Sequence, residues 1–364
     1  MNGTTNVHGQ TATPVEVEAL RHAFDLARRG PAVDVNPRVG CVLLGPDGAT
    51  IGEGWHRGAG TPHAEVAALT DAAERGHDTY GSTAVVTLEP CNHTGRTGPC
   101  SEALIAAGVR RVVVSVEDPN PLAAGGAARL RAEGIDVLAG ILPDEGHQVL
   151  GAWIRSVDRG RPFVTLKLAT TLDGRIAAAD GSSRWITGEV ARQHAHDLRA
   201  EVDAIAVGTG TALADDPTLT ARTADGSLHG HQPLRVVVGR RDLPAAAALS
   251  GPGGELVHVR THDPREVLRA LADKGVRHVL VEGGPTLAAA FLRAGLVDEV
   301  HAYVAPVLLG AGRPAVDDLG ITTIGSALRL VTRSVLPLGP DVLVVATPES
   351  PVPTDPAVRT DQEH

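Results

Sequence analysis

The sequence is poor in aromatic residues and cysteine, and it has no long hydrophobic run. Trp, Tyr and Phe together make up 2% of the 364 residues, so the cores must consist mainly of Ala, Val, Leu and Ile. No apolar run approaches the roughly 20 residues that cross a membrane, and the first residues lack the charged start and apolar stretch of a signal peptide. Three cysteines cannot all pair, which argues against a disulfide framework and predicts a cytoplasmic protein.

Basic residues are also fewer than acidic residues. Lys and Arg number 33 against 43 Asp and Glu, which gives a net charge of −10. A surface that binds nucleic acid needs an excess of positive charge to neutralise phosphates, so we expect no nucleic-acid partner. A few arginines can still form a local pocket for a small anionic ligand.

The chain is about twice the usual length of one domain and is 43% hydrophobic, which is typical of a two-domain globular protein. We expect a disordered lead at 1–13, a first domain at 14–160, a second domain at 161–347 and a disordered tail at 348–364. Apolar periodicity and turn residues predict the elements of the first domain. They are helices at 14–29, 63–75, 101–107, 122–133 and 144–162, and strands at 39–44, 49–54, 83–88, 110–116 and 135–139.

The same pattern restarts after the Asp158-Arg159-Gly160-Arg161-Pro162 stretch. It predicts strands at 163–169, 175–178, 203–208, 234–239, 277–281 and 297–304, and helices at 188–200, 264–274 and 285–294. Alternating strands and helices indicate an α/β protein in which a largely parallel sheet is covered on both faces.

Two of the three cysteines, Cys91 and Cys100, lie in one turn-rich loop, each directly after a proline. His63 and Glu65 precede this loop, at the start of the predicted helix 63–75. One imidazole and two thiolates supply three ligands for tetrahedral zinc and leave a fourth position for water, which is typical of a catalytic site. Glu65 can carry a proton from that water to a leaving amine. The pattern therefore predicts a zinc-dependent deaminase.

Other interpretations of these residues remain open. His93 in the same loop is a rival metal ligand, although a polar loop residue or substrate contact is favoured. Cys41 lies in an apolar strand, which indicates a core residue. The loop between the two cysteines is also longer than the two-residue gap usual in this chemistry.

The first half resembles the deaminase half of the bifunctional riboflavin-biosynthesis deaminase-reductase (RibD) family. The matching residues are Asn36-Pro37-Arg38-Val39-Gly40-Cys41-Val42, Pro62-His63-Ala64-Glu65-Val66, Thr87-Leu88-Glu89-Pro90-Cys91, Gly95-Arg96-Thr97 with Cys100, and Asp118-Pro119-Asn120-Pro121. The family usually has two prolines before the second cysteine, whereas Gly98-Pro99 stands here. The resemblance implies that Asn36 holds the substrate ring.

The second half resembles the reductase half of the same family, so the resemblance covers about nine-tenths of the chain. The matching stretches are Leu166-Lys167-Leu168-Ala169, Thr171-Leu172-Asp173-Gly174, Ser183-Arg184-Trp185-Ile186-Thr187, Leu198-Arg199, Thr211 with Leu213-Ala214-Asp215-Asp216-Pro217, Leu219-Thr220-Ala221-Arg222, and Val281-Glu282-Gly283-Gly284-Pro285-Thr286-Leu287.

The residues of the second half also suggest a phosphate-binding function directly. Gly283, Gly284 and Pro285 end a strand and open a helix, so phosphate oxygens could approach backbone N–H groups there. A plain strand-to-helix turn is the alternative. Arg199 and Arg222 could clamp a sugar phosphate, and Trp185 in its polar loop could stack on a ligand or simply pack.

The resemblance assigns ligand contacts in the reductase half. It implies that NADPH is held by Ala169, Trp185, Thr211, Asp215, Gly283, Gly284, Pro285 and Thr286. It implies that the substrate is held by Lys167, Ser183, Arg199, Leu219, Arg222 and Glu282. Asp215-Asp216 as a metal pair is the alternative, but Pro217 favours a turn.

By the same resemblance, the N-terminal domain is a cytidine-deaminase-like three-layer domain and the C-terminal domain is dihydrofolate-reductase-like. The expected reactions are zinc-dependent deamination of 2,5-diamino-6-(5-phosphoribosylamino)pyrimidin-4-one and NADPH-dependent reduction of the ribosyl group of the product to ribityl. The family's oligomers imply a homodimer or tetramer. Two alternatives are a deaminase that acts on nucleic-acid bases and a zinc-stabilised binding protein with His93 as fourth ligand.

Arg240 departs from the related sequences, which carry a small hydroxyl residue at about this position. It follows the predicted strand 234–239, at the end where open α/β sheets bind ligands. An arginine there could select NADPH through its 2′-phosphate. A solvated surface arginine is the alternative.

Overall fold

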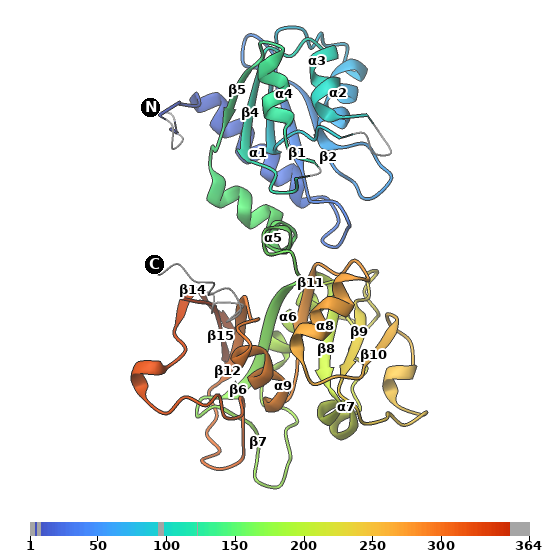
Figure 1. Cartoon of the computed structure of the whole chain (residues 1–364), viewed down its shortest axis with the longest axis vertical. Coiled ribbons are helices and arrows are strands. Elements are labelled where there is room, and N and C mark those ends of the chain that lie inside the picture. The colour runs from blue at the N-terminus through green and yellow to red at the C-terminus, as the bar shows by residue number, and fades with distance from the viewer. Residues whose placement is uncertain (1–3, 6–8, 94–97, 122, 350–364) are drawn as a thin grey trace, which may run out of the picture. The chain divides into compact units, whose positions relative to one another are not determined.

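The structure is a computed structural model that describes residues 4–5, 9–93, 98–121 and 123–349 (Figure 1). The chain divides into two compact units, Met1–Gly160 and Arg161–His364. All of Gly95-Arg96-Thr97 and most of the tail expected at 348–364 lie outside the described residues. The described part of that tail belongs to a strand that ends at Pro348.

The described residues of the 1–13 segment, expected as a disordered lead, make contacts with the first unit. Thr5 and Thr11 form an isolated β-bridge, and Ala12 is fully buried. Thr13 caps α1 (Pro14–Arg28) by accepting a hydrogen bond from the backbone of Glu16, whose carboxylate accepts one from the Thr13 backbone. This reciprocal capping box fixes where the helix begins.

The N-terminal unit contains a five-stranded mixed sheet in the order β2-β1-β3-β4-β5. Its strands are β1 (Gly40–Leu44), β2 (Thr50–Trp55), β3 (Thr83–Leu88), β4 (Arg111–Val116) and β5 (Asp136–Ala139). β1 pairs antiparallel with both β2 and β3, and only β3, β4 and β5 run parallel. The sheet of this unit is therefore less parallel than the sequence suggested, because the turn at 45–48 makes a hairpin.

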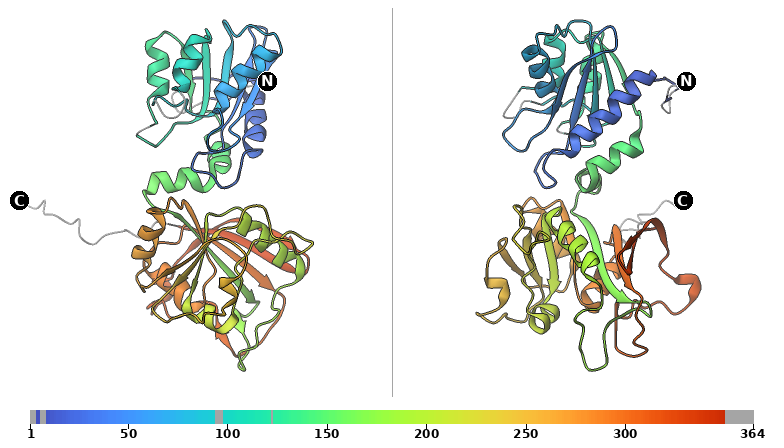
Figure 2. Two further views of the ribbon diagram at one scale, coloured as in Figure 1. Left: turned by 90° about the vertical axis from the view of Figure 1, so that its right-hand side faces the viewer. Right: turned by 180° about the vertical axis from the view of Figure 1, so that it is seen from behind.

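Helices cover both faces of this sheet (Figure 2). One face packs against α1 and α5 (Pro143–Arg159), and the other against α2 (Ala64–Glu74), α3 (Cys100–Ala106) and α4 (Gly126–Ala132). The two core layers consist almost entirely of Ala, Val, Leu and Ile, as the scarcity of aromatic residues required. This makes the unit a three-layer α/β/α domain.

The C-terminal unit contains an eight-stranded sheet in the order β10-β9-β8-β11-β6-β12-β15-β14. Its strands are β6 (Phe163–Thr171), β8 (Ala204–Gly208), β9 (Leu234–Val238), β10 (Leu256–Val259), β11 (His278–Val281), β12 (Glu299–Ala305), β14 (Leu330–Leu338) and β15 (Asp341–Pro348). The six strands from β10 to β12 are parallel, and β15 and β14 are antiparallel. The short strands β7 (Arg175–Ala177) and β13 (Arg313–Pro314) pair separately.

This sheet is also covered on both faces (Figure 1). α6 (Glu189–Ala200), α7 (Thr209–Asp215) and the 3-10 turn Ala248–Ser250 cover one face, and α8 (Pro264–Ala272) and α9 (Pro285–Arg293) cover the other. A second 3-10 turn spans Ile324–Ser326. The parallel order brings the carboxyl ends of β6, β8, β9, β11 and β12 to one edge, where the candidate reductase residues follow.

Among the described residues, no helix is long and apolar enough to cross a membrane.

Candidate active sites

His63 and Glu65 are placed by the start of α2, for which His63 is the N-cap residue. The helix lies close to β2 because two glycines of that strand face it. A Cβ atom on Gly54 would stand 2.3 Å from the carbonyl oxygen of Ala64, and one on Gly52 would stand 2.4 Å from that of Ala68. These glycines allow the beginning of α2 to pack directly on the sheet.

Cys91 and Cys100 are placed by the loop after β3 and by the first residue of α3. The buried carboxylate of Glu89 accepts hydrogen bonds from the backbone N–H groups of Asp118, Gly125 and Ala127, at 3.1, 3.1 and 2.9 Å. These bonds tie the loop before Cys91 to the start of α4. The N–H of Cys100 in turn donates to Sγ of Cys91 at 3.4 Å.

The structure brings the three predicted metal ligands together. Their ligand atoms all lie within 4.8 Å of one another, and Nδ1 of His63 is 3.6 Å from Sγ of Cys91 and 3.3 Å from Sγ of Cys100. Zn–S bonds of about 2.3 Å and a Zn–N bond of about 2.0 Å at tetrahedral angles separate N and S by about 3.5 Å. The donor set and its spacing therefore fit a zinc ion.

The electrostatics of the cluster favour metal binding. The hydrogen bond with Cys100 and the contact with His63 lower the pKa of the Cys91 thiol to about 4. The contact with Cys91 raises the pKa of His63, while the hydrogen bond with Cys91 and burial raise the pKa of Cys100. One sulfur is thus already a thiolate at neutral pH, which is the form that binds a metal.

Glu65 is buried beside this cluster, with 3% of its surface exposed. Burial raises the pKa of its carboxyl group to about 7. A carboxyl group that titrates near neutral pH can both accept and return a proton under working conditions. This agrees with the role expected for Glu65.

Asn36 makes a contact that the sequence did not reveal. Its amide nitrogen lies 3.1 Å from Nε2 of His56, whose Nδ1 lies 3.2 Å from the carbonyl oxygen of Pro62. The His56 and His63 rings are edge-to-face with centroids 5.6 Å apart. His56 is buried and directly orients Asn36, but it stands alone in the sequence and only its spatial neighbours identify it.

His93, the rival ligand, does not join the metal cluster. It is exposed, and within the described part of the chain the cluster consists of His63, Cys91 and Cys100. Cys41 is fully buried among the core residues of β1, as expected. A site with three protein ligands leaves a coordination position for water.

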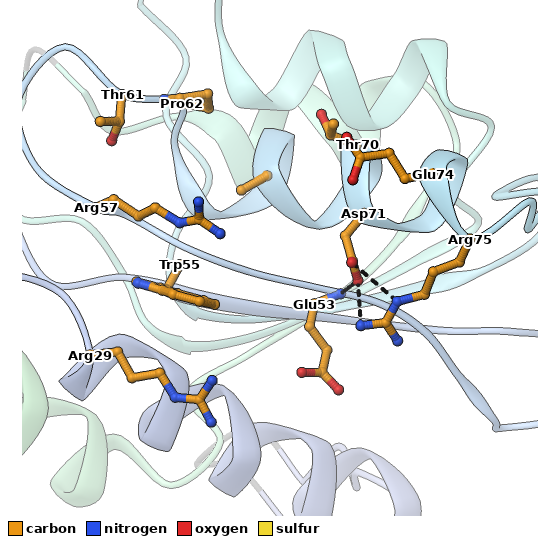
Figure 3. Close-up of a pocket in the computed structure, with 11 residues that line it drawn as sticks. Arg29, Glu53, Trp55, Arg57, Thr61, Pro62, Thr70, Asp71, Glu74 and Arg75 are labelled. Carbon is orange, nitrogen blue, oxygen red and sulfur yellow. Dashed lines mark hydrogen bonds and ion pairs between the residues drawn. The ribbon is translucent and has the colours of Figure 1, made fainter.

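A cavity of about 450 Å³ lies against β2 and α2 of the first unit. Figure 3 shows the indole of Trp55 between the guanidinium groups of Arg57 and Arg29, whose Cζ atoms lie 4.6 and 5.3 Å from the ring centroid. Asp71 on α2 receives hydrogen bonds from Arg75 and from the backbone of Glu53. The metal ligands do not line this cavity, so it is separate from the metal centre.

In the C-terminal unit, Lys167, Arg199 and Glu282 form one cluster from three elements. Arg199 on α6 donates two hydrogen bonds to the Glu282 carboxylate, at 2.7 and 2.8 Å. Nζ of Lys167 on β6 lies 3.6 Å from the same carboxylate. Burial alone would raise the pKa of Glu282, but the charges of Arg199 and Lys167 outweigh it and lower the pKa to about 2. Glu282 is therefore a fixed anion.

Arg199, predicted to contact the sugar phosphate, also has partners within the protein. Its planar group is occupied by Glu282, and its remaining nitrogen donates to the carbonyl oxygen of Thr220 at 3.1 Å. Arg222 donates to the Thr220 hydroxyl and to the carbonyl oxygen of Gly226. The loop before it contains Leu219, which is buried with a φ of 50°.

The glycines after β11 have packing partners of their own. A Cβ atom on Gly283 would stand 2.8 Å from Cβ of Leu287, so this position requires glycine whatever else it binds. The N–H of Gly284 donates to Oγ1 of Thr211 at 3.0 Å, and Thr286 donates to Asp317 at 2.7 Å. The Gly284 N–H, an expected phosphate donor, is thus engaged within the protein.

The other residues predicted for the cofactor, and Ser183 predicted for the substrate, lie on β6, on α7 and on loops. Trp185 is 70% exposed, with Cζ of Arg192 4.7 Å from its ring centroid. The carbonyl oxygen of Asp215 accepts from Arg184 at 3.0 Å. Asp216 accepts from the backbone of Ala248 at 2.7 Å, which agrees with a turn rather than a metal pair. Three further residues are half-buried Ser183, half-buried Ala169 on β6, and exposed Arg240 directly after Gly239.

The lysine content contains information about Lys167 that spacing alone did not show. Lys167 and Lys274 are the two lysines of the whole chain, in which Lys and Arg together number 33. Arginine carries almost all of the other positive charge, and an ammonium group differs from a guanidinium group in shape and hydration. Lys274 is exposed and pairs with Glu255 on the surface.

Two family models match the chain. The cytidine and deoxycytidylate deaminase zinc-binding region matches residues 15–116, and the RibD C-terminal domain matches residues 162–344. The first match covers the unit that contains the metal cluster, and the second covers most of the other unit.

Similar proteins cover nearly the whole chain. The riboflavin biosynthesis protein RibD of Mycobacterium tuberculosis is 53% identical over 327 residues, which are 90% of this chain and 94% of that protein. The protein of the same name from Escherichia coli is 40% identical over 89% of this chain and 96% of its own length. The solved structure of Acinetobacter baumannii RibD has a TM-score of 0.83 and 39% identity, and covers 92% of this chain and 99% of that chain.

A second solved structure carries a more specific name. It is a diaminohydroxyphosphoribosylaminopyrimidine deaminase/5-amino-6-(5-phosphoribosylamino)uracil reductase from Thermotoga maritima. Its TM-score is 0.83 at 32% identity, over 92% of this chain and 99% of that one.

Proposed function

This chain belongs to the RibD family of riboflavin-biosynthesis enzymes, and we propose which of its residues take part in each of the two reactions. The protein is a bifunctional enzyme with a zinc-binding deaminase domain and a reductase domain. We infer that the first removes ammonia from 2,5-diamino-6-(5-phosphoribosylamino)pyrimidin-4-one. The second then reduces the ribosyl group of 5-amino-6-(5-phosphoribosylamino)uracil to ribityl.

The observation that carries the deaminase assignment is the convergence of His63, Cys91 and Cys100 beside a buried Glu65. Zinc held by these three residues would supply Lewis-acid activation of a water molecule for attack on the ring carbon that bears the amine. Glu65 accepts a proton during the attack and returns it to the leaving amino group, a role that suits a pKa of about 7. Asn36, oriented by His56, holds the pyrimidine ring.

In the reductase domain, NADPH would supply the hydride for C1 of the sugar. Lys167 and Glu282 contact the ribose, and Arg199 holds the Glu282 carboxylate in place. Ser183, Leu219 and Arg222 contact the rest of the phosphorylated substrate. The residues that would hold NADPH are Ala169 on β6, Trp185 in the loop before α6, Thr211 and Asp215 on α7, Arg240 after β9, and Gly283–Thr286 after β11. Catalysis here consists mainly of positioning.

We also propose that the chain self-associates as a dimer or tetramer. β14 is a nine-residue edge strand, and its apolar side chains are exposed, with Val335 58% and Leu336 42% accessible. An exposed apolar edge is a liability that a second copy can cover. We place the enzyme in the cytoplasm, because Cys91 and Cys100 must stay free thiols to bind a metal.

The test is to incubate the protein with the diamino substrate, with and without NADPH, and to follow ammonia release and NADPH oxidation separately. We expect ammonia release in both cases and NADPH oxidation only after deamination. Ammonia release that requires NADPH, or NADPH oxidation without ammonia release, would contradict the proposed order of reactions.

A further inference from the structure

Tyr303 on β12 is the largest fully buried side chain of the described chain, with 1% of its surface exposed. It packs against Ala191 and Ala195 of α6 and against Leu343 of β15. A sequence with so few aromatic residues has thus placed one of its two tyrosines under the reductase cluster. The largest core cluster of this unit consists of Val, Ala and Leu apart from Phe291, so a buried hydroxyl group is unusual in it.

The hydroxyl group of Tyr303 has a dedicated partner. It lies 2.8 Å from Nδ1 of His194 on α6, and the two rings are 5.7 Å apart at 64°. Burial raises the pKa of Tyr303 and lowers the pKa of His194, so a neutral hydroxyl meets a neutral imidazole. This hydrogen bond satisfies a buried polar group and fixes the direction of the ring.

The ring of Tyr303 lies next to the ammonium group of Lys167. Lys167 and Ala169 on β6 pair in parallel with His301 and Tyr303 on β12, so all four side chains point to the face that α6 covers. Nζ of Lys167 is 5.7 Å from the centroid of the Tyr303 ring and 3.6 Å from the Glu282 carboxylate. The ammonium group is therefore held between an anion and an aromatic face.

We propose that Tyr303 and His194 form a positioning pair for Lys167 in the reductase reaction, an inference that rests on the proposed contact of Lys167 with the substrate. The aromatic face attracts the ammonium group, and the hydrogen bond to His194 keeps that face in place. Glu282 is fixed by Arg199 in the same way. Lys167 thus has one oriented neighbour on each side.

The test is a double-mutant cycle in the full-length enzyme, supplied with NADPH and the deaminated intermediate. Tyr303→Leu should lower kcat for reduction about threefold to thirtyfold, the range of a partly buried cation–π contact, and leave the KM for NADPH within about twofold. In a Lys167→Met background, Tyr303→Leu should cause no further loss, because its effect passes through the lysine. Losses that simply add would overturn the inference.

Lysine labelling gives a second readout that core packing would not change. Lys167 and Lys274 are the only lysines, so limited acetylation followed by mass spectrometry reports on each. Tyr303→Leu should increase acetylation of Lys167 relative to Lys274 at least threefold, because the ammonium group loses a stabilising neighbour. Tyr303→Phe keeps the ring and should restore most of the protection while still losing the bond to His194.

Phe291→Leu is the matched control, since Phe291 is also fully buried in the same unit but lies on α9, in a different core cluster. It should leave the ratio of Lys167 to Lys274 acetylation unchanged. A change equal to that of Tyr303→Leu would show that the labelling responds to core packing in general. Lys167→Met distinguishes a failure of the proposed role of Lys167 from a failure of the positioning pair. If that variant reduced the intermediate at the wild-type rate, the proposed role of Lys167 would fail; if it were inactive while Tyr303 variants left Lys167 unaffected, only the positioning pair would fail.

Discussion

The two candidate sites are built in different ways. The metal centre draws His63, Cys91 and Cys100 from within 38 residues, on two helix starts and one loop of a single sheet edge. The reductase cluster draws Lys167, Arg199, Glu282 and Tyr303 from four elements spread over 137 residues. The metal centre depends on coordination at fixed ligand distances. The reductase cluster depends on the order of the strands in the parallel sheet, which places its side chains together.

This difference explains why the first site could be recognised from spacing and the second could not. A tetrahedral metal requires particular residue types at particular separations, and those requirements appear as a motif. Substrate positioning accepts many arrangements of charges, and the important contacts, such as those of Arg199 to Glu282, occur between residues far apart in sequence. The following variants test whether the two sites are as independent as their construction suggests.

The largest effect should come from Cys91→Ser. Loss of one thiolate should remove zinc, measured as about one metal ion per chain in the wild type, and bring ammonia release below detection. Reduction of supplied deaminated intermediate should stay within about twofold, because Lys167 and Glu282 belong to another unit. Loss of NADPH oxidation in a protein that remains folded by circular dichroism would break the two-site comparison.

Glu65→Gln should have the next largest effect. The variant keeps all three ligands, so zinc content should be unchanged, but ammonia release should fall by about 10²–10⁴-fold because the proton carrier is gone. Metal analysis and ammonia assays on the same preparation check this. Loss of zinc would make Glu65 a structural neighbour of the ligands, and full turnover would exclude it as the proton carrier.

Glu282 allows a test of the reductase site through pH. Its pKa is lowered from 4.5 to about 2 in the folded protein, so the stability it contributes is fully present above pH 4.5 and is lost as the pH falls toward 2. The loss amounts to about 3 kcal/mol of unfolding free energy. Glu282→Gln should remove this part of the pH dependence.

Urea titrations between pH 2 and 6 measure the slope of the unfolding free energy against pH. Pulsed hydrogen exchange follows the peptides of β11 and β12 over the same pH range. Glu255→Gln is the control, because Glu255 forms an exposed pair with Lys274 and should leave the slope nearly unchanged. Equal slopes in wild type and Glu282→Gln would show that the Arg199–Glu282 pair is not a fixed ion pair.

The smallest effect is expected for Arg240→Ala. A charge-assisted contact to the 2′-phosphate is worth roughly 1.5–3 kcal/mol, so the KM for NADPH should rise about ten- to a hundredfold and that for NADH should hardly change. Arg241→Ala is the matched control, because the side chain of this neighbouring arginine donates a hydrogen bond to Thr209 within the protein. Equal changes for both cofactors, or none, would make Arg240 a surface residue.

Most helices and strands of both units followed from apolar periodicity, and their ends mostly lie within a few residues of the expected positions. The elements that were missed are α7, β10, β13, β14 and β15, and two of them have weak patterns. α7 has few apolar positions, and the apolar residues of β14 do not alternate with polar ones because that strand is exposed on both faces. β15 and β14 also add an antiparallel pair that the alternation of strands and helices did not suggest.

The sequence by itself predicted which three residues the structure brings together as a candidate metal site, with Glu65 beside them, because metal coordination restricts both residue type and spacing. It also determined the α/β class, because period-2 and period-3.6 patterns record which faces are buried. Only the tertiary structure decided that Arg199 holds Glu282, that His56 orients Asn36, that Gly283 is required by Leu287 and that Tyr303 lies under Lys167. Each of these contacts joins side chains brought together by strand pairing or helix packing, and no local pattern in the chain records which distant residue will be the partner.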